Sequence, residues 1–158
     1  MDGAVNTAAD APARLVIDTN VLVSALVFKD SRHLPLRQSW QAGRVIPLLS
    51  IKTYRELKRV LGYEMFKLSD DQIAEGIAHL GPFIEWVKID DAVIVSLPKC
   101  SDRDDQKFLN AALCGRADAL LTYDRALLKL RKRVPFAVTK PETWSEQLYA
   151  TDDCQMVV

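Results

Sequence analysis

Apolar and polar positions follow two spacings along the chain, and these spacings predict where strands and helices lie. Residues 15–17 are three consecutive apolar residues that end at Asp18, a pattern typical of a short buried strand. The apolar run over residues 21–28 is long enough to form a helix that packs on this strand. Asp18 is therefore expected where a core strand ends and a helix begins.

The rest of the chain repeats this change of spacing. Apolar residues at helical spacing, capping boxes and terminal glycines predict helices over residues 34–42, 51–61, 70–80, 105–114, 125–130 and 141–149. Short apolar runs predict strands over residues 44–50, 119–124 and 134–139. Residues 83–89 and 92–97 are predicted as strands or extended segments. Pro47 indicates an edge or an end of the second strand.

Strands that alternate with helices predict a parallel sheet that is covered on both faces. We therefore expect an α/β fold, a three-layer α/β/α sandwich with a central, mostly parallel sheet. The length of 158 residues suits one domain. We place this domain at residues 13–150, with a tail of residues 1–12 before it and a tail of residues 151–158 after it.

Composition narrows the classes of partner. Lys+Arg and Asp+Glu both number 21, so net charge favours neither nucleic acid nor an anionic membrane, and a nucleic-acid site must be a local patch. No apolar run reaches the roughly 18 residues of a membrane span, and the first residues do not resemble a secretory signal. The three cysteines are widely spaced without a CxxC pair, which predicts a reducing, cytoplasmic location.

Carboxylates recur at the predicted junctions between strands and helices. Asp18 and Asp124 follow two strands, Asp104 and Asp105 begin a helix, and Glu56 lies in the first turns of a helix that follows a third strand. In open parallel sheets, ligands bind beyond the carboxyl ends of the strands. Four separate junctions are therefore expected to bring a carboxylate to one edge of the sheet.

Converging carboxylates need compensation. Two of them about 4 Å apart repel by roughly 4 kcal/mol at an effective dielectric of about 20. The cluster must therefore take up protons or bind a cation, and oxygen ligands without His or Cys favour Mg²⁺ or Mn²⁺. Water bound to such an ion can be made nucleophilic toward a phosphoryl group.

Each acid also has a structural interpretation. Asp18, Asp104, Asp105 and Asp124 are all at positions where an aspartate caps a helix or compensates its dipole. Glu56 is at a position where it would close a capping box with Thr53 or face solvent. The common location of the acids, rather than any one of them, favours a site. Asp118, in the turn before a strand, is interpreted as structural.

Three segments, "VIDTNVLVSAL", "TYRELKRVL" and "DRDDQKFLNAALCGRADALLTYDRALLKL", resemble the PIN-domain nucleases, in particular the VapC-like toxin components. The resemblance covers residues 15–148. It implies a PIN-like fold and an Mg²⁺- or Mn²⁺-dependent endoribonuclease that cleaves RNA with a metal-activated water. It also implies the toxin role of a type II toxin-antitoxin system, with a small antitoxin protein as partner and a homodimer as assembly.

The resemblance can be carried over residue by residue. Its acids match Asp18, Glu56, Asp105 and Asp124, which it implies as catalytic residues and metal ligands. Supporting positions are Asn20, Asp104 and Thr122. Cations beside these acids are candidate RNA contacts: Arg55, Arg59, Arg103, Lys107 and Arg125. Arg103 departs from the group, which often has proline at this position.

Two other classes of function stay open. A phosphatase of the haloacid-dehalogenase type would use Asp18 as a nucleophile, but such enzymes need a second aspartate where this chain has Asn20. A non-catalytic PIN-fold module would bind RNA or protein without cleavage. The retained acids favour the nuclease over both.

Overall fold

The computed structural model describes residues 11–28 and 32–144. In this part of the chain five strands form one sheet in the order β3-β2-β1-β4-β5, and every neighbouring pair is parallel. The strands are β1 (Ala13–Ile17), β2 (Val45–Leu49), β3 (Glu85–Trp86), β4 (Ala119–Leu121) and β5 (Ala137–Thr139). The prediction of a mostly parallel central sheet is confirmed.

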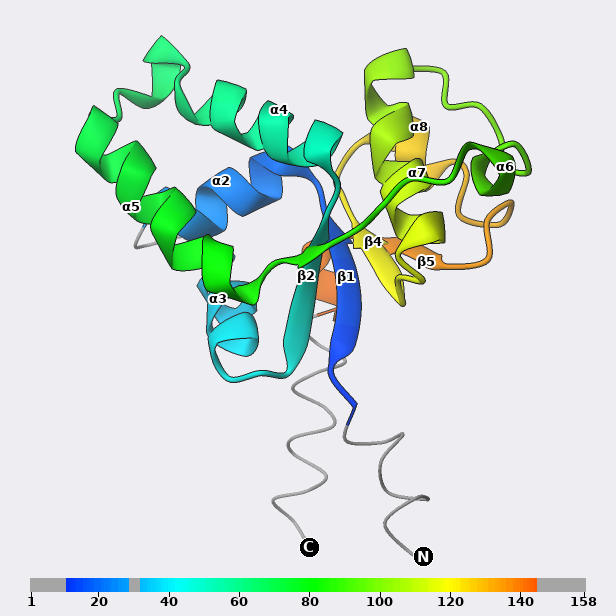
Figure 1. Ribbon diagram of the computed structural model, residues 1–158, viewed down its shortest axis with the longest axis horizontal. Helices are drawn as coiled ribbons and strands as arrows, with labels where there is room; N and C mark the ends of the chain where they lie inside the picture. The colour runs from blue at the N-terminus through cyan, green and yellow to red at the C-terminus, as the bar shows by residue number, and fades with distance from the viewer. Residues whose placement is uncertain (1–10, 29–31, 145–158) are drawn as a thin grey trace, which may run out of the picture.

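Helices cover both faces of this sheet (Figure 1). One face carries α2 (Thr19–Val27), α3 (Leu34–Gln41), α4 (Ile51–Leu61) and α5 (Asp70–Leu80). The other carries α6 (Asp91–Ile94), α7 (Gln106–Cys114) and α8 (Arg125–Leu128). Short 3-10 turns are η1 (Glu64–Phe66), η2 (Gly81–Phe83) and η3 (Arg103–Asp105). The predicted three-layer α/β/α sandwich is confirmed. Within the described ranges, no helix combines the length and apolar character needed to cross a membrane.

Alternate residues of the central strands face two separate hydrophobic cores. Leu15 and Leu121 pack in the core beneath α2, α3, α4 and α5, whereas Val16 and Leu120 pack in the core beneath α7 and α8. All four side chains are almost fully buried. A strand that is buried on both faces needs apolar residues at successive positions, which explains the continuous runs in the sequence.

Local signals define the start of α4. The Ser50 hydroxyl accepts a hydrogen bond from the Thr53 N–H, and the Thr53 hydroxyl accepts one from the Ser50 N–H. This reciprocal capping box satisfies two backbone donors that the first turn leaves unpaired. Glu56 is therefore not part of the cap, and the capping interpretation of Glu56 is wrong. Its carboxylate is left to make contacts beyond its own helix.

Residues 92–97 do not form a strand, so that expectation is wrong. The Asp90 carboxylate accepts a hydrogen bond from the Ala92 N–H at 3.0 Å and begins α6. Val93 and Val95 are 41% and 80% exposed, so their β-branched side chains have no sheet surface to pack against. Local capping therefore prevailed over strand propensity.

Other boundaries differ from the predictions in length. The segment 83–89 contributes only the two residues of β3, and Pro47 of β2 lies before the stretch that pairs with β3. Pro47 therefore has only β1 as a neighbouring strand, in agreement with its interpretation. Residues 141–144 are helical, whereas the rest of the predicted last helix and both predicted tails, apart from residues 11 and 12, lie outside the described residues. The domain limits stay predictions.

Arg14 ties together the amino end of the sheet. Its guanidinium donates to both carboxylate oxygens of Glu85 and to the carbonyl oxygen of Gly115. This contact lowers the pKa of Glu85. The Arg14 backbone N–H donates to the Asp118 carboxylate at 2.8 Å, which confirms the structural interpretation of Asp118. A Cβ atom on Gly115 would lie 2.8 Å from the carbonyl oxygen of Ala111, so this close packing requires glycine.

Candidate active site

A cleft of about 440 Å³ lies at the carboxyl end of the sheet, lined by the start of α2, by α4, by the end of η3 and by the loop between β4 and α8. Asp18 reaches it from the end of β1 and Glu56 from α4. Asp105 reaches it from the end of η3, and Asp124 from the residue before α8. The parallel strands all end at this edge, so the four predicted acids, although far apart in sequence, line one cleft.

Asp18 is held by a buried hydroxyl. Its Oδ2 accepts a hydrogen bond from Oγ1 of Thr122 at 2.6 Å, and the same hydroxyl accepts one from the Asp124 N–H at 2.9 Å. The Asp18 side chain makes no capping hydrogen bond to α2, although it precedes this helix. Burial raises the pKa of Asp18, and the negative charges of Glu56 and Asp124 act in the same direction.

Asp124 has both roles that the sequence left open. Its Oδ1 accepts hydrogen bonds from the N–H groups of Ala126 and Leu127 at 2.7 and 3.3 Å, so it caps α8. It also lines the cleft, where its carboxylate interacts with that of Asp105. The Asp124 side chain is therefore both the cap of α8 and a residue of the candidate active site.

Asp105 lies among other carboxylates of the cleft and its border. Burial raises the pKa of Asp105 to about 7, together with its contact with Asp124 and the negative charges of Asp102 and Asp18. Its Oδ2 is buried and, within the described part of the chain, has no hydrogen-bond partner. A buried carboxylate oxygen without a donor is costly, and a bound cation would remove that cost.

The cleft does not hold a closed cage of ligands. Among residues 11–28 and 32–144, no three His, Cys, Asp or Glu side chains are arranged as a ready metal cluster. The donor set nevertheless fits a hard divalent ion, because Asp18, Asp105 and Asp124 supply only carboxylate oxygens. The unpartnered Oδ2 of Asp105 is the atom of the cleft that most needs such an ion.

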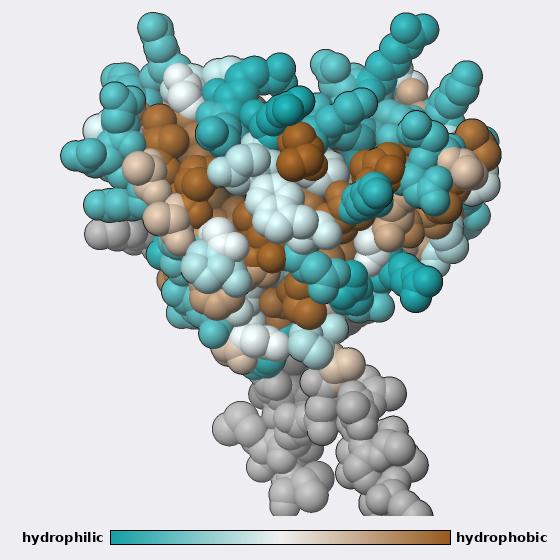
Figure 2. Space-filling view, viewed as in Figure 1, coloured by the Kyte–Doolittle hydropathy of each residue, from teal (hydrophilic) through white to brown (hydrophobic). Residues whose placement is uncertain are grey.

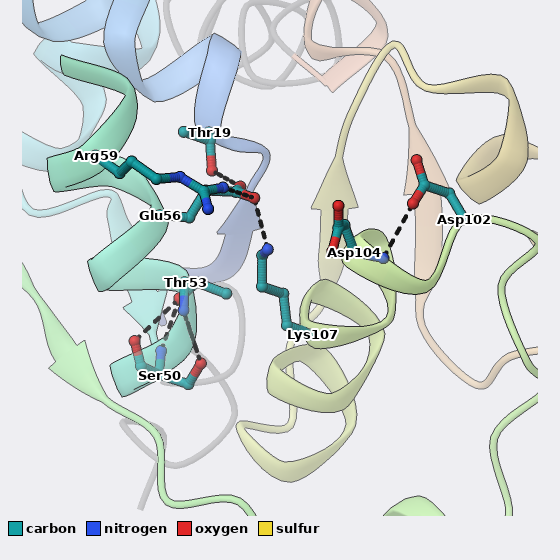
Figure 3. A network of polar contacts seen from close by, with 8 residues as sticks. All are labelled: Thr19, Ser50, Thr53, Glu56, Arg59, Asp102, Asp104 and Lys107. Atoms are coloured by element: carbon teal, nitrogen blue, oxygen red, sulfur yellow. Dashed lines mark hydrogen bonds and ion pairs between the residues drawn. The ribbon is translucent and has the colours of Figure 1, made fainter. Parts of the chain in front are cut away.

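Glu56 is in different surroundings (Figure 3). Its carboxylate accepts a hydrogen bond from the Thr19 hydroxyl and forms ion pairs with Lys107 at 2.5 Å and Arg59 at 3.6 Å. The Glu56 and Lys107 side chains are only 14% and 16% exposed. Since Lys107 comes from α7, this ion pair joins α7 to α4 beside the cleft.

Two of these contacts were not predicted. Thr19 follows Asp18 directly and is 3% exposed, yet its only signal in the sequence is a polar residue between two apolar runs. Lys107 was predicted to contact RNA, whereas the structure places its ammonium on Glu56. Both residues therefore position a candidate catalytic acid.

The remaining predicted residues are divided between the cleft and its surroundings. Asn20 and Arg59 line the cleft, and Arg55 lines the pockets beside it. Three predicted residues are exposed and do not line the cleft: Asp104, Arg103 and Arg125. Asp104 and Arg103 lie on η3, where the Asp104 N–H donates to the Asp102 carboxylate, and Arg125 borders a separate basic depression on α8.

A family model described as a PIN domain matches residues 14–126, which is more than half of the chain and includes all four acids. No curated protein matches the chain. PIN domains are generally metal-dependent nucleases, so the match supports a nuclease-type function acting on nucleic acid. The chain belongs to the PIN domain family.

Proposed function

We propose that the protein is a metal-dependent endoribonuclease that cleaves RNA phosphodiester bonds by attack of water. The observation that carries this proposal is the uncompensated negative charge of the cleft. Asp18, Asp105 and Asp124 meet there, and within the described residues none of them forms an ion pair. Such an arrangement is suited to hold a cation rather than to stabilise the fold.

We assign Mg²⁺ or Mn²⁺ to Asp18, Asp105 and Asp124. The ion would supply an activated water and would offset the charge that develops on the phosphoryl oxygens. Glu56 was predicted as a fourth metal ligand, but its carboxylate already accepts one hydrogen bond and forms two ion pairs. We therefore propose Glu56 as a catalytic acid of the cleft that the protein's own cations hold in place.

The protein's residues would divide the remaining work. Thr122 keeps Asp18 oriented through its 2.6 Å hydrogen bond. Asp105 would orient or deprotonate the attacking water, because its carboxylate lines the cleft together with those of Asp18 and Asp124. Arg59 lines the cleft and would bind a phosphate of the RNA there. Arg55 would contact the next part of the RNA strand. Arg103 and Arg125 are exposed and stay candidate RNA contacts, and Lys107, although paired with Glu56, stays one because it lines the depression beside the cleft.

We also propose that the nuclease is the toxin of a type II toxin-antitoxin system, a cytoplasmic homodimer with a small antitoxin partner. This part of the proposal rests on the motif resemblance alone. Growth arrest on expression, relieved by the product of a short neighbouring reading frame, would support it. Growth that continues normally while RNA is cleaved in vitro would contradict the toxin role and leave the nuclease proposal intact.

The nuclease proposal is tested by RNA cleavage with Mn²⁺, with and without EDTA, for the wild type and Asp18→Asn. We expect cleavage with Mn²⁺, none with EDTA, and a loss of about 10²- to 10³-fold in Asp18→Asn. Asp71→Asn is the control, because Asp71 is an exposed aspartate on α5 outside the cleft. Full turnover by Asp18→Asn would contradict the proposal. A wild type without cleavage and without stabilisation by Mn²⁺ would indicate a non-catalytic module.

A further inference from the structure

A second pocket, of about 380 Å³, lies beside the acid cleft, and we call it the side pocket. It is formed by the start of α4, by α7 and by the segment of residues 87–94 that follows β3. Aliphatic side chains make up much of its lining: Ile51, Val87, Ile89 and Ile94. Figure 2 shows hydrophobic surface between α4 and α7, bordered by hydrophilic side chains. The side pocket therefore offers an apolar surface to a ligand.

Cations border the side pocket. Lys52, Arg55 and Lys88 line it and are exposed, and within the described residues none of the three forms an ion pair. Asp91 is the single acid of its lining. In a chain whose net charge is zero, this is a local excess of positive charge that suits a phosphate-bearing ligand.

A shallower depression of about 280 Å³ connects the side pocket with the acid cleft. It shares Lys52, Arg55 and Lys107 with the side pocket, and Glu56 and Arg59 with the acid cleft. An RNA strand that places the phosphate to be cleaved at the aspartates would therefore pass over these cations and reach the side pocket next.

Asn110 adds a polar group to the apolar wall. It lines the side pocket from α7, and its side-chain amide forms no hydrogen bond with any described residue. An amide presents both a donor and an acceptor, which is the pairing that the edge of a nucleobase offers. Apolar walls, an unpaired amide and a cationic border together match the face, the edge and the phosphate of one nucleotide.

We propose that the side pocket binds one nucleotide of single-stranded RNA next to the bond that is cleaved. The base would pack on Ile89 and Ile94 with its edge at Asn110, and the phosphate would lie between Lys52 and Arg55. This inference rests on the proposed nuclease function, because it takes the acid cleft as the place of cleavage.

The phosphate contacts are tested by fluorescence anisotropy of a labelled RNA octamer in EDTA, which prevents cleavage. We expect Lys52→Ala and Arg55→Ala each to weaken binding by about 2- to 5-fold and to reduce the slope of log affinity against log salt by about 0.7. Lys58→Ala is the matched control, since Lys58 is an exposed lysine on the same helix that packs over the Tyr54 ring outside the side pocket. An equal loss in Lys58→Ala would overturn the proposed site.

The base contact is tested with octamers in which one nucleotide at a time is abasic. The wild type should lose about fivefold in affinity at one position, because roughly 40 Å² of apolar base surface no longer packs there. Asn110→Ala should bind the unmodified octamer more weakly and discriminate less among the four bases at that position. Equal affinity for every abasic octamer, or unchanged base preference in Asn110→Ala, would overturn the assignment.

These measurements separate the two proposals. If Asp18→Asn cleaves as well as the wild type while the Lys52 and Arg55 variants lose affinity, the proposed chemistry fails and the binding site stands. If cleavage requires Asp18 and Mn²⁺ while Lys52→Ala and Arg55→Ala bind like Lys58→Ala, the side pocket fails and the nuclease stands.

Discussion

The two sides of the acid cleft differ in how their negative charge is compensated. On the aspartate side, Asp18, Asp105 and Asp124 meet without an ion pair to any described residue, and the pKa values of Asp18 and Asp105 are raised. On the glutamate side, Glu56 accepts a hydrogen bond from Thr19 and forms ion pairs with Lys107 and Arg59 (Figure 3). Both sides are built from carboxylates, yet only the aspartate side is left with charge to be neutralised.

This difference bears on which acids of the cleft would bind a metal ion. A carboxylate that the protein has already paired gains less from a cation than one that repels its neighbours. We therefore expect substitutions on the aspartate side to alter metal binding, and substitutions on the glutamate side to alter mainly the stability and geometry of the cleft.

The largest expected effect is on Mn²⁺ affinity. Asp105→Asn should weaken Mn²⁺ binding by at least about 100-fold, because it neutralises the carboxylate whose buried oxygen lacks a donor. Glu56→Gln should weaken it by no more than about threefold. Calorimetric titration of both variants against the wild type measures this contrast, and equal losses would erase the distinction between the two sides.

The second effect is on folding. Lys107→Met leaves Glu56 without its nearest cation and should lower the free energy of unfolding by about 2 kcal/mol, less than for a fully buried pair because both side chains keep some exposure. Urea denaturation measures it. The double variant Glu56→Gln/Lys107→Met should recover part of the loss. A double variant that is no more stable than Lys107→Met would argue against a buried charge at Glu56.

A smaller effect is expected at Thr19. Thr19→Val keeps the shape of the buried side chain but removes the hydroxyl that donates to Glu56, so it should cost about 1 kcal/mol of stability. Thr19→Ser retains the donor and should stay near the wild type. Thermal denaturation of the three proteins compares them, and if valine and serine behave alike the hydrogen bond is not what holds Glu56.

The smallest effect is a pH dependence of the metal-free protein. The pKa of Asp105 is raised from 3.8 to about 7, so folding favours its protonated form. As pH rises from about 4 to 7, Asp105 loses its proton in the unfolded chain before it does so in the folded protein, so its contribution to stability declines. Above pH 7 the carboxyl is ionised in both states, and the contribution stays constant.

Asp105→Asn cannot titrate, so in EDTA its Tm should exceed that of the wild type by about 2–4 °C at pH 8 and by less at pH 4.5. Melting curves across this pH range measure the difference between the two proteins. Parallel changes of Tm in the wild type and the variant would show that Asp105 does not titrate in this window.

The sequence was sufficient for the parts of the site that depend on strand ends. Asp18 and Asp124 follow buried apolar runs, and parallel strands must end at one edge, so their common location could be deduced. The pair of Glu56 and Lys107 could not, because it depends on how α4 and α7 pack. A lysine on a helix is normally solvated, and the sequence has no signal that marks an exception.

The error at residues 92–97 has a different cause. Val93, Ile94 and Val95 favour a strand by their side chains, but a strand also needs a neighbour to pair with. Sequence patterns do not say whether that neighbour is present. Asp90 supplies a helical cap within two residues, and a contact so close in sequence prevailed.

The contacts of Arg14 have a consequence for engineering. They join β1, β3 and the end of α7 at the opposite end of the strands from the aspartates. Contacts that stabilise the fold and the proposed active site therefore lie at opposite ends of the parallel strands. We expect a library of variants restricted to the surroundings of Arg14 to contain proteins of higher and lower thermal stability. The proposed cleavage activity should be the same in all of them that fold.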